Sequence, residues 1–294
     1  YVEFTKSTFD KDLDLRGLKI VVDCANGAGY RVAPMAIEEL GAEIVVINDE
    51  PNGININENS GATAPGAMAR KVVELSADIG ISLDGDGDRL IVCDHQGNIV
   101  DGDLIMGICA IHMKKEGKLS NNTLVATVMS NQGFVKSLKK HDINVVRANV
   151  GDRYVLEAMR AGGYNLGGEQ SGHLIFLDYN TTGDGLISAL QLLKVMVKEK
   201  KPLKELAAQI DIFPQVLENV MVASKPPLEK LTKTSTLIDT TNEKLGDTGR
   251  VLVRYSGTES KLRVMLEGAD LAKITAYAKE IAAVAVSEIE ALGK

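Results

Sequence analysis

Carboxylates stand at every second position of the hexapeptide 84–89, which reads DGDGDR. The two intervening glycines permit a tight backbone curl that would turn Asp84, Asp86 and Asp88 inward around one point. Three carboxylates so close together repel one another unless a cation lies between them. Oxygen ligands suit Mg²⁺ or Ca²⁺, and three protein ligands leave coordination positions for water and phosphate, which favours Mg²⁺. The segment therefore predicts a Mg²⁺ site, and the alternative is a solvated acidic turn.

Two other known uses of such a loop fit these residues less well. An EF-hand loop requires Gly at position six and Glu at position twelve, where counting from Asp84 gives Arg89 and His95. The segment is therefore not an EF-hand. A phosphatase that forms an aspartyl phosphate would use Asp84 as its nucleophile, but the third carboxylate and Arg89 do not suit that arrangement. The phosphatase stays open as a minor alternative.

A second polar segment, GGEQSGH at 167–173, lies in a Gly-rich loop just before an expected strand. The carboxylate, amide and hydroxyl groups of Glu169, Gln170 and Ser171 are hydrogen-bond partners that sugar hydroxyls need. The imidazole of His173 is able to move a proton near neutral pH. The segment predicts a sugar-binding loop, and the alternative for His173 is a hydrogen-bonded histidine at a strand edge.

A third segment, RYSGTES at 254–260, joins two expected strands and is followed by a further arginine. Hydroxyl groups, loop amides and two guanidinium groups together form a phosphate-binding set. The members of this set are Arg254, Ser256, Gly257, Thr258 and Arg263. The alternative is a hairpin turn that carries surface charges.

Alternating strand and helix patterns predict the elements that must position these segments. Strands are expected at 18–25, 43–48, 78–84, 123–128, 144–149 and 173–177, with a hairpin near 90–100 and helices at 67–76, 103–115, 133–140, 153–161 and 185–198. Residues 1–9 are expected to be a strand or linker, and 162–172 a loop. After a run of prolines, three strands with short connections predict an antiparallel sheet, closed by a helix at 271–292.

The resulting fold class is α/β. We expect two consecutive α/β sandwich domains with mixed sheets, at 1–101 and 102–212, followed by a small C-terminal α+β domain at 213–294. In this division the first domain carries the metal loop, the second the sugar loop and the third the phosphate loop.

The composition excludes several classes of protein. With 40 acidic and 33 basic side chains the formal charge is −7, so the chain offers no broad basic surface to nucleic acid. No apolar run approaches the roughly 20 residues of a membrane span, and no secretion signal opens the chain. The 3 cysteines are too scattered for a disulfide framework. We therefore expect a cytoplasmic protein with neither nucleic acid nor membrane as a partner.

A metal loop, a sugar loop and a phosphate loop in this order resemble the α-D-phosphohexomutase superfamily over the whole chain. The resemblance is carried by EFTKSTF, VDCANGA, EPNGININ, DGDGDR, VDGDLIM, MSNQG, VGDRYV, GGEQSGH, TTGDG and SGTE. These segments look most like the bacterial phosphoglucosamine mutase branch, and Gln170 favours that branch over phosphomannomutases and phosphoglucomutases.

This resemblance implies an isomerase that interconverts glucosamine 6-phosphate and glucosamine 1-phosphate through a bisphosphate intermediate, for amino-sugar and peptidoglycan precursor synthesis. It implies Mg²⁺ ligands at Asp84, Asp86 and Asp88, and catalytic roles for Arg89 and His173. Substrate binding would fall to Glu169, Ser171 and His173, and binding of the phosphate that does not react to Arg254, Ser256, Gly257, Thr258 and Arg263.

The chain departs from the family pattern in two respects. Tyr255 and Ser260 occupy positions where the family commonly has prolines, although every expected phosphate ligand is kept. The phosphoserine loop of the family, a Ser-His-Asn-Pro type of segment on an N-terminal domain, has no counterpart in these residues. We therefore expect the missing N-terminal domain to be a partner, and the chain alone to bind phosphosugar without turnover.

Two alternatives to this reading stay open. One is a non-catalytic module that binds Mg²⁺ and phosphosugar, and the other is a different phosphohexomutase. Either alternative, like the mutase itself, is compatible with a homo-oligomer.

Overall fold

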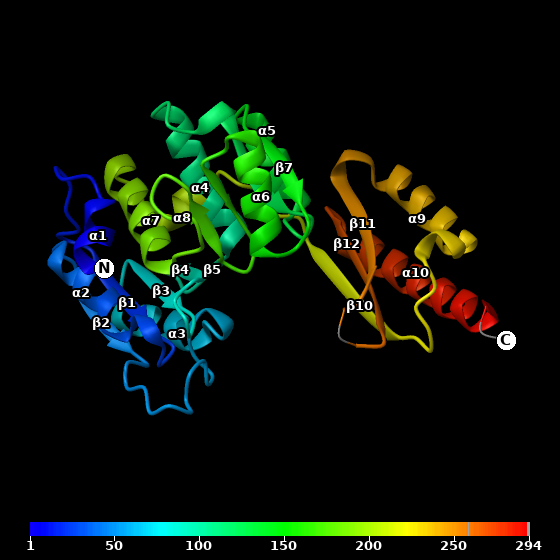
Figure 1. Ribbon diagram of the computed structural model, residues 1–294, viewed down its shortest axis with the longest axis horizontal. Coiled ribbons are helices and arrows are strands. Elements are labelled where there is room, and N and C mark those ends of the chain that lie inside the picture. The colour runs from blue at the N-terminus through cyan, green and yellow to red at the C-terminus, as the bar shows by residue number, and fades with distance from the viewer. Residues whose placement is uncertain (258, 293–294) are drawn as a thin grey trace. The chain divides into compact units, whose positions relative to one another are not determined.

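The computed structural model describes residues 1–257 and 259–292, which form two compact units (Figure 1). The first unit contains Tyr1–Ser130 and Phe134–Ile210, and the second contains Asn131–Gly133 and Asp211–Lys294. Each unit has its own hydrophobic core. Thr258, one of the expected phosphate ligands, lies outside the described residues.

The first sheet of the first unit has the strand order β2 (Glu43–Ile47), β1 (Lys19–Asp23), β3 (Ile79–Leu83), β4 (Leu90–Asp94) and β5 (Ile99–Val100). The strands β2, β1 and β3 are parallel, whereas β4 and β5 each pair antiparallel with the strand before them in this order. Helices cover both faces of this sheet. Successive side chains of β1 point to opposite faces and so pack against different helices. Ile20 and Val22 share a core with α2 (Val32–Glu39), and Val21 packs with α3 (Gly66–Leu75).

The second sheet of the first unit has the order β7 (Asn144–Ala148), β6 (Thr123–Thr127), β8 (Leu166–Gly168) and β9 (Leu174–Phe176). Only β9 is antiparallel to its neighbour, so this sheet is also mixed. Val125 packs with α6 (Asp152–Gly162) on one face. Leu124 and Ala126 belong to a larger core with α4 (Gly102–Lys115), α5 (Gln132–Lys140) and α7 (Gly185–Glu199).

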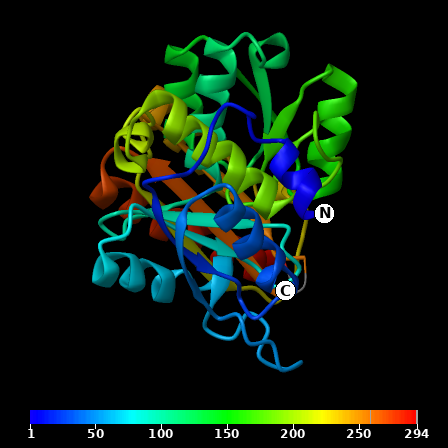
Figure 2. The ribbon, with the colours of Figure 1, turned by 90° about the vertical axis from the view of Figure 1, so that its left-hand side faces the viewer.

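The helix α7 packs against both sheets of the first unit. It contacts β3 and β4 of the first sheet and β9 of the second (Figure 2). Its residues are buried from Gly185 to Met196, as expected for a helix that has protein on all sides. Both sheets therefore share one core.

The second unit is a three-stranded sheet with helices packed on it. Its strand order is β10 (Gln215–Met221), β12 (Lys261–Gly268) and β11 (Gly249–Tyr255), all antiparallel. Two helices, α9 (Thr232–Leu245) and α10 (Leu271–Leu292), complete the unit. The buried stripe of α10 recurs at helical spacing, at Ile274, Ala278, Ile281, Ala285 and Ile289.

The predicted fold class is confirmed, and so is the antiparallel C-terminal sheet. The predicted boundaries 1–101 and 102–212 stay a prediction, because both of their sheets lie within one compact unit. Among the described residues, no helix is both long and apolar enough to cross a membrane.

The structure contradicts the prediction from the sequence at two places. The opening segment, expected to be a strand or linker, forms the helix α1 (Val2–Ser7). Its alternating pattern is misleading because Phe4 is 46% exposed while Thr5 is buried. The expected loop 162–172 contains the strand β8, whose two glycines mask the strand pattern. Further short elements are α8 (Leu203–Ala207) and the 3-10 helices Ala28–Tyr30, Gly61–Thr63, Ser120–Asn122, Leu228–Lys230 and Gly246–Thr248.

Candidate functional site

The aspartate loop, residues 84–89, begins where β3 ends, and its carboxylates converge. β3 is wholly buried, so the chain leaves the core at Asp84. One carboxylate oxygen from each of Asp84, Asp86 and Asp88 lies within 4.8 Å of the others. Gly87 has a φ of +77°, a left-handed conformation that side chains with a Cβ rarely adopt. The structure therefore brings together the three carboxylates that the sequence singles out.

These carboxylates differ in burial and hydrogen bonding. Asp84 is 6% exposed, and its Oδ1 accepts a 3.0 Å hydrogen bond from the main-chain N–H of Arg89. Burial, with the negative charges of Asp88 and Asp86, raises the pKa of Asp84 to about 6 against the opposing effect of that N–H.

The carboxylate of Asp88 leaves one oxygen available. Its Oδ1 is buried and has no hydrogen-bond partner within the described part of the chain, and the nearest cation, Arg89 Nε, lies 3.8 Å away. A buried oxygen of this kind, beside two further carboxylates, suits a hard divalent cation. The donor set of this loop therefore fits Mg²⁺.

His173 holds the other oxygen of Asp88. Its Nδ1 lies 3.0 Å from Asp88 Oδ2, and its Nε2 accepts a 3.1 Å hydrogen bond from the N–H of Gly183. Because Nε2 accepts, the neutral ring carries its proton on Nδ1 and donates it to Asp88. His173 is 5% exposed, and both ring nitrogens bond within the protein. This arrangement favours a role for His173 in orienting Asp88 over the proton transfer expected from the sequence.

The aspartate loop and the Gly-rich loop, residues 167–173, meet through contacts that only glycine allows. The N–H of Leu90 donates to the carbonyl of Gly172 over 3.0 Å, and a Cβ on Gly172 would collide with the carbonyl oxygen of Leu90. Gly185, the first residue of α7, donates to Gly87 O over 2.9 Å, and a Cβ there would lie 2.5 Å from Arg89 O. Backbone contacts thus fix the aspartate loop from two sides.

The Gly-rich loop connects β8 to β9 and presents a carboxylate and a hydroxyl. Glu169 Oε1 accepts a 2.9 Å hydrogen bond from the N–H of Gly151, just before α6. Ser171 Oγ donates to Glu169 Oε2 over 3.3 Å, and the Ser171 side chain is exposed. One oxygen of Glu169 therefore holds the loop in place, while Ser171 remains at the surface.

Gln170 makes a contact that the sequence reasoning missed. Its side-chain Nε2 donates to Asp101 Oδ2 over 3.1 Å. Its main-chain carbonyl accepts from the N–H of Gly102 over 3.0 Å. Asp101 is the N-cap of α4, where its Oδ1 accepts from the N–H of Leu104, and burial raises its pKa. Gln170 thus anchors the Gly-rich loop on the start of α4. An Asp before a helical pattern is an N-cap signal, but the sequence gives no signal for its partner.

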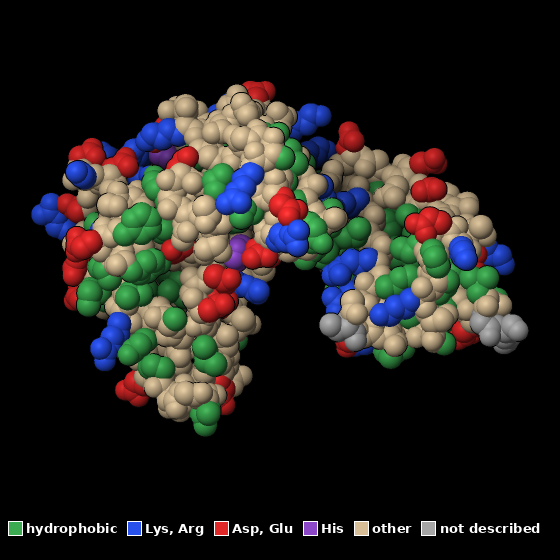
Figure 3. All heavy atoms as spheres, viewed as in Figure 1, with side chains coloured by type: hydrophobic (Ala, Val, Ile, Leu, Met, Phe, Trp, Pro, Cys, Tyr) green, Lys and Arg blue, Asp and Glu red, His purple; other side chains and the backbone are tan. Residues whose placement is uncertain are grey.

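The third segment, here called the phosphate loop (residues 254–260), connects β11 to β12. Arg254 and Arg263 lie directly opposite each other across these antiparallel strands, so their side chains share one face of the sheet. Ser256 is 3% exposed and its Oγ accepts from the N–H of Glu259 over 3.2 Å, whereas Gly257 is exposed. Basic side chains gather on the second unit beside this loop (Figure 3). The structure thus brings the two arginines together.

Two charged groups at the phosphate loop, Lys225 outside it and Glu259 within it, were also missed from the sequence. Lys225 Nζ donates to the carbonyl of Ser256 over 2.6 Å. Glu259 accepts a 2.6 Å hydrogen bond from Lys261, which lowers its pKa, and its other oxygen lies 3.5 Å from Arg263 Nη2. Lys225 comes from the segment after β10, which the sequence marks only by its prolines.

Three family models match successive parts of this chain. The family model for phosphoglucomutase/phosphomannomutase, alpha/beta/alpha domain II, matches residues 1–97. The model for alpha/beta/alpha domain III matches 101–213, and the model for the C-terminal domain matches 192–284. The aspartate loop, the Gly-rich loop and the phosphate loop fall in these three matches in order.

Curated relatives match this chain over nearly all of its residues. A phosphoglucosamine mutase from Syntrophotalea carbinolica is 57% identical over 282 residues, which are 96% of this chain and 62% of the relative. A phosphoglucosamine mutase from Sorangium cellulosum is 53% identical over 290 residues, 98% of this chain and 60% of the relative. This chain therefore spans 60–62% of the length of these two relatives.

Solved structures show the same fold at low identity. An N-acetylphosphoglucosamine mutase from Aspergillus fumigatus matches with a TM-score of 0.79 and 21% identity, over 98% of this chain and 64% of that one. A structure of that enzyme in complex with GlcNAc-6P and magnesium matches with a TM-score of 0.75 and 22% identity, over 98% and 64% of the two chains.

Proposed function

This chain belongs to the phosphoglucomutase/phosphomannomutase family, and we propose that it carries the metal, sugar and phosphate sites of a phosphoglucosamine mutase. Such an enzyme interconverts glucosamine 6-phosphate and glucosamine 1-phosphate through a bisphosphate intermediate. The phosphoserine that carries the phosphoryl group lies outside these 294 residues in this proposal. Relatives of that name at 57% and 53% identity support the amino-sugar substrate.

The observation that carries the proposal is the convergence of Asp84, Asp86 and Asp88, with Asp88 oriented by His173. In the proposal these three carboxylates hold Mg²⁺. The bound ion would neutralise charge on the phosphoryl group that is transferred. Arg89 would add positive charge beside the same group, since its Nε lies 3.6 Å from Asp84 Oδ2 and 3.8 Å from Asp88 Oδ1 without a hydrogen bond to either.

The other two loops would bind the rest of the substrate. Glu169 and Ser171 would accept and donate hydrogen bonds to sugar hydroxyls, and His173 would position Asp88. The phosphate loop would hold the phosphate that does not react, through Arg254, Ser256, Gly257, Thr258 and Arg263. Anchoring this phosphate separately allows the sugar to turn around between the two half-reactions.

Several further properties belong to the same proposal. We place the enzyme in the cytoplasm, in the supply of amino sugar for peptidoglycan, and we treat the whole protein as a phosphoprotein. The three domains would divide near 1–101, 102–212 and 213–294, so that each domain contributes one loop. A homo-oligomer is compatible with this arrangement.

Isothermal titration calorimetry of the purified 294-residue chain tests the proposal. With Mg²⁺ present, glucosamine 6-phosphate should bind more tightly than glucose 6-phosphate. Asp84→Asn should abolish Mg²⁺ binding, and Asp247→Asn, an exposed acid of the second unit, should leave it unchanged. Equal affinity for the two sugar phosphates would contradict the amino-sugar assignment.

Turnover measurements test two further points: whether the phosphoryl carrier lies outside these residues, and whether the chain acts as a phosphatase. The chain alone should neither interconvert the two phosphates nor release inorganic phosphate. Mutase turnover without a partner would show that the phosphoryl carrier lies within these residues. Release of phosphate that Asp84→Asn abolishes would instead support a phosphatase.

A further inference from the structure

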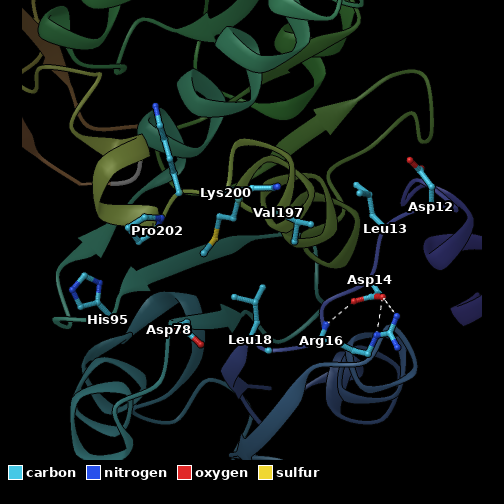
Figure 4. A pocket seen from close by; sticks show the side chains of 13 residues that line it. Asp12, Leu13, Asp14, Arg16, Leu18, Asp78, His95, Val197, Lys200 and Pro202 are labelled. Carbon is cyan, nitrogen blue, oxygen red and sulfur yellow. Dashed lines mark hydrogen bonds and ion pairs between the residues drawn. The ribbon is translucent and has the colours of Figure 1, made fainter.

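A cavity of about 780 Å³, here called the distal pocket, opens in the first unit (Figure 4). It lies where the parallel strands of the first sheet begin: Leu18 precedes β1, and Asp78 precedes β3. His95, just after β4, and Pro202, just after α7, line it as well. This volume is in the range that small-molecule sites occupy in proteins.

The distal pocket is separate from the aspartate loop. The five residues of β3 lie between them, and a strand rises ~3.3 Å per residue, which gives about 17 Å. The helix α7 also spans this separation, because Gly185 contacts the aspartate loop while Lys200 lines the pocket. At 1.5 Å per residue its 15 residues cover about 22 Å.

One part of the distal pocket is apolar. Leu13 and Leu18 come from the segment before β1, and Met196 and Val197 from the last turn of α7. Met196 is 4% exposed, and Leu13, Leu18 and Val197 are partly buried against the same core. Such a wall suits the face of a planar or apolar group.

Two lysines at the end of α7 supply charge without a partner. No acidic group in the described part of the chain lies within ion-pair distance of Lys200 or Lys201. Their backbone is fixed, because their N–H groups donate to the carbonyls of Val197 and Met196, each over 3.3 Å. Unpaired ammonium groups on a fixed backbone suit a phosphate.

The acids of the distal pocket are mostly bonded to the protein. Asp14 is paired with Arg16, whose Nε donates to it over 2.8 Å (Figure 4). Asp78 accepts a 2.8 Å hydrogen bond from the N–H of Lys19. Asp12 is exposed and lies beyond Leu13, on the far side of the pocket from Pro202 and His95 (Figure 4). Asp14 and Asp78 therefore have partners within the protein, whereas no acid pairs with Lys200 or Lys201 in the described part of the chain.

We propose that the distal pocket binds a nucleotide, with its phosphate on Lys200 and Lys201 and its base against Leu18, Met196 and Val197. A base has the flat apolar face that this wall matches, and the cavity is large enough for a nucleoside phosphate. This site is independent of the proposed mutase function, since none of its residues belongs to the three loops.

Isothermal titration calorimetry of the full chain with AMP, in buffer containing EDTA, tests this proposal. AMP should bind more tightly than adenosine or inorganic phosphate, because each of these probes uses only one side of the pocket. The double variant Lys200→Gln with Lys201→Gln should weaken AMP binding about tenfold or more. Val197→Glu, which places a carboxylate on the apolar wall, should weaken it as well.

Matched controls separate the distal pocket from other sites. Lys230→Gln with Lys279→Gln removes two exposed lysines of the second unit and should leave AMP affinity unchanged. Absence of AMP binding, equal affinity for inorganic phosphate, or an unchanged Lys200/Lys201 double variant would each overturn the proposal. If Arg263→Gln abolishes AMP binding, the nucleotide occupies the phosphate loop, and the distal pocket is refuted while the mutase function is not.

Discussion

His173 donates its Nδ1–H to Asp88 Oδ2 over 3.0 Å, and the other oxygen of Asp88 is buried without a hydrogen-bond partner in the described part of the chain. The two residues are 85 positions apart and come from different loops. The hydrogen bond therefore ties the orientation of a candidate metal ligand to the conformation of the Gly-rich loop.

Removing the imidazole donor should weaken metal binding by the aspartate loop. His173→Leu leaves Asp88 Oδ2 without its donor and should lower Mg²⁺ affinity by about tenfold or more. His173→Asn, whose amide N–H lies close to the position of Nδ1, should retain most of the affinity. Titration calorimetry with MgCl₂ measures both, and equal Mg²⁺ affinity in His173→Leu and the parent would refute the positioning role.

The contact between Gly172 and Leu90 predicts a large loss of stability on adding one methyl group. Gly172 has a φ of +95°, and a Cβ there would collide with the carbonyl oxygen of Leu90. Gly172→Ala should lower the free energy of unfolding by about 2–4 kcal/mol, from backbone strain and overpacking together. Gly117→Ala is the matched control, because Gly117 has a φ of +68° but open space around it. Similar urea midpoints for the two variants would show that the close approach has no energetic weight.

The sequence predicted the elements that bury a regular apolar pattern. The strand β3 is buried along its whole length and forms a short continuous buried run, and α10 buries a stripe at helical spacing. The pattern failed at α1, where alternation of apolar residues does not correspond to burial, and at β8, which has three residues, two of them glycine. Short elements are decided by tertiary contacts that no local pattern records.

The candidate site also has one part that the sequence predicted and another part that it did not. Convergence of the aspartates follows from local spacing and intervening glycines, so the sequence was sufficient to predict it. The partners of His173 and Gln170 lie 85 and 69 residues away, at points where two loops meet. Lys225 reaches the phosphate loop from 31 residues away. Such contacts depend on packing between elements, which a single sequence does not specify.

The ion pairs of Glu116 predict a pH dependence of stability. Hydrogen bonds from Lys118, over 2.7 Å, and Lys198, over 2.5 Å, lower its pKa from 4.5 to about 2. A carboxyl whose pKa is lowered by folding stabilises the protein above its unfolded pKa, and that contribution is lost as the pH falls toward the folded pKa. Between pH 7 and about pH 3 the parent should therefore lose about 1 kcal/mol more than Glu116→Gln, since the partly exposed pairs are screened.

Urea unfolding at several pH values measures this difference. Glu280→Gln, at an exposed position of α10, serves as the control and should follow the parent at every pH. Parallel pH profiles for the parent and Glu116→Gln would show that these ion pairs do not contribute to stability.

The hydrogen bond between Gln170 and Asp101 allows a test of whether Gln170 anchors the Gly-rich loop or binds the sugar. Gln170→Met has a side chain of similar length without an N–H donor, so Asp101 Oδ2 would lose its partner. The free energy of unfolding should fall by about 1–2 kcal/mol. In an Asp101→Ala background the same change should cost much less, because the partner is already absent. A direct sugar contact predicts the reverse: weaker binding of glucosamine 6-phosphate, unchanged urea midpoints and no energetic coupling to Asp101.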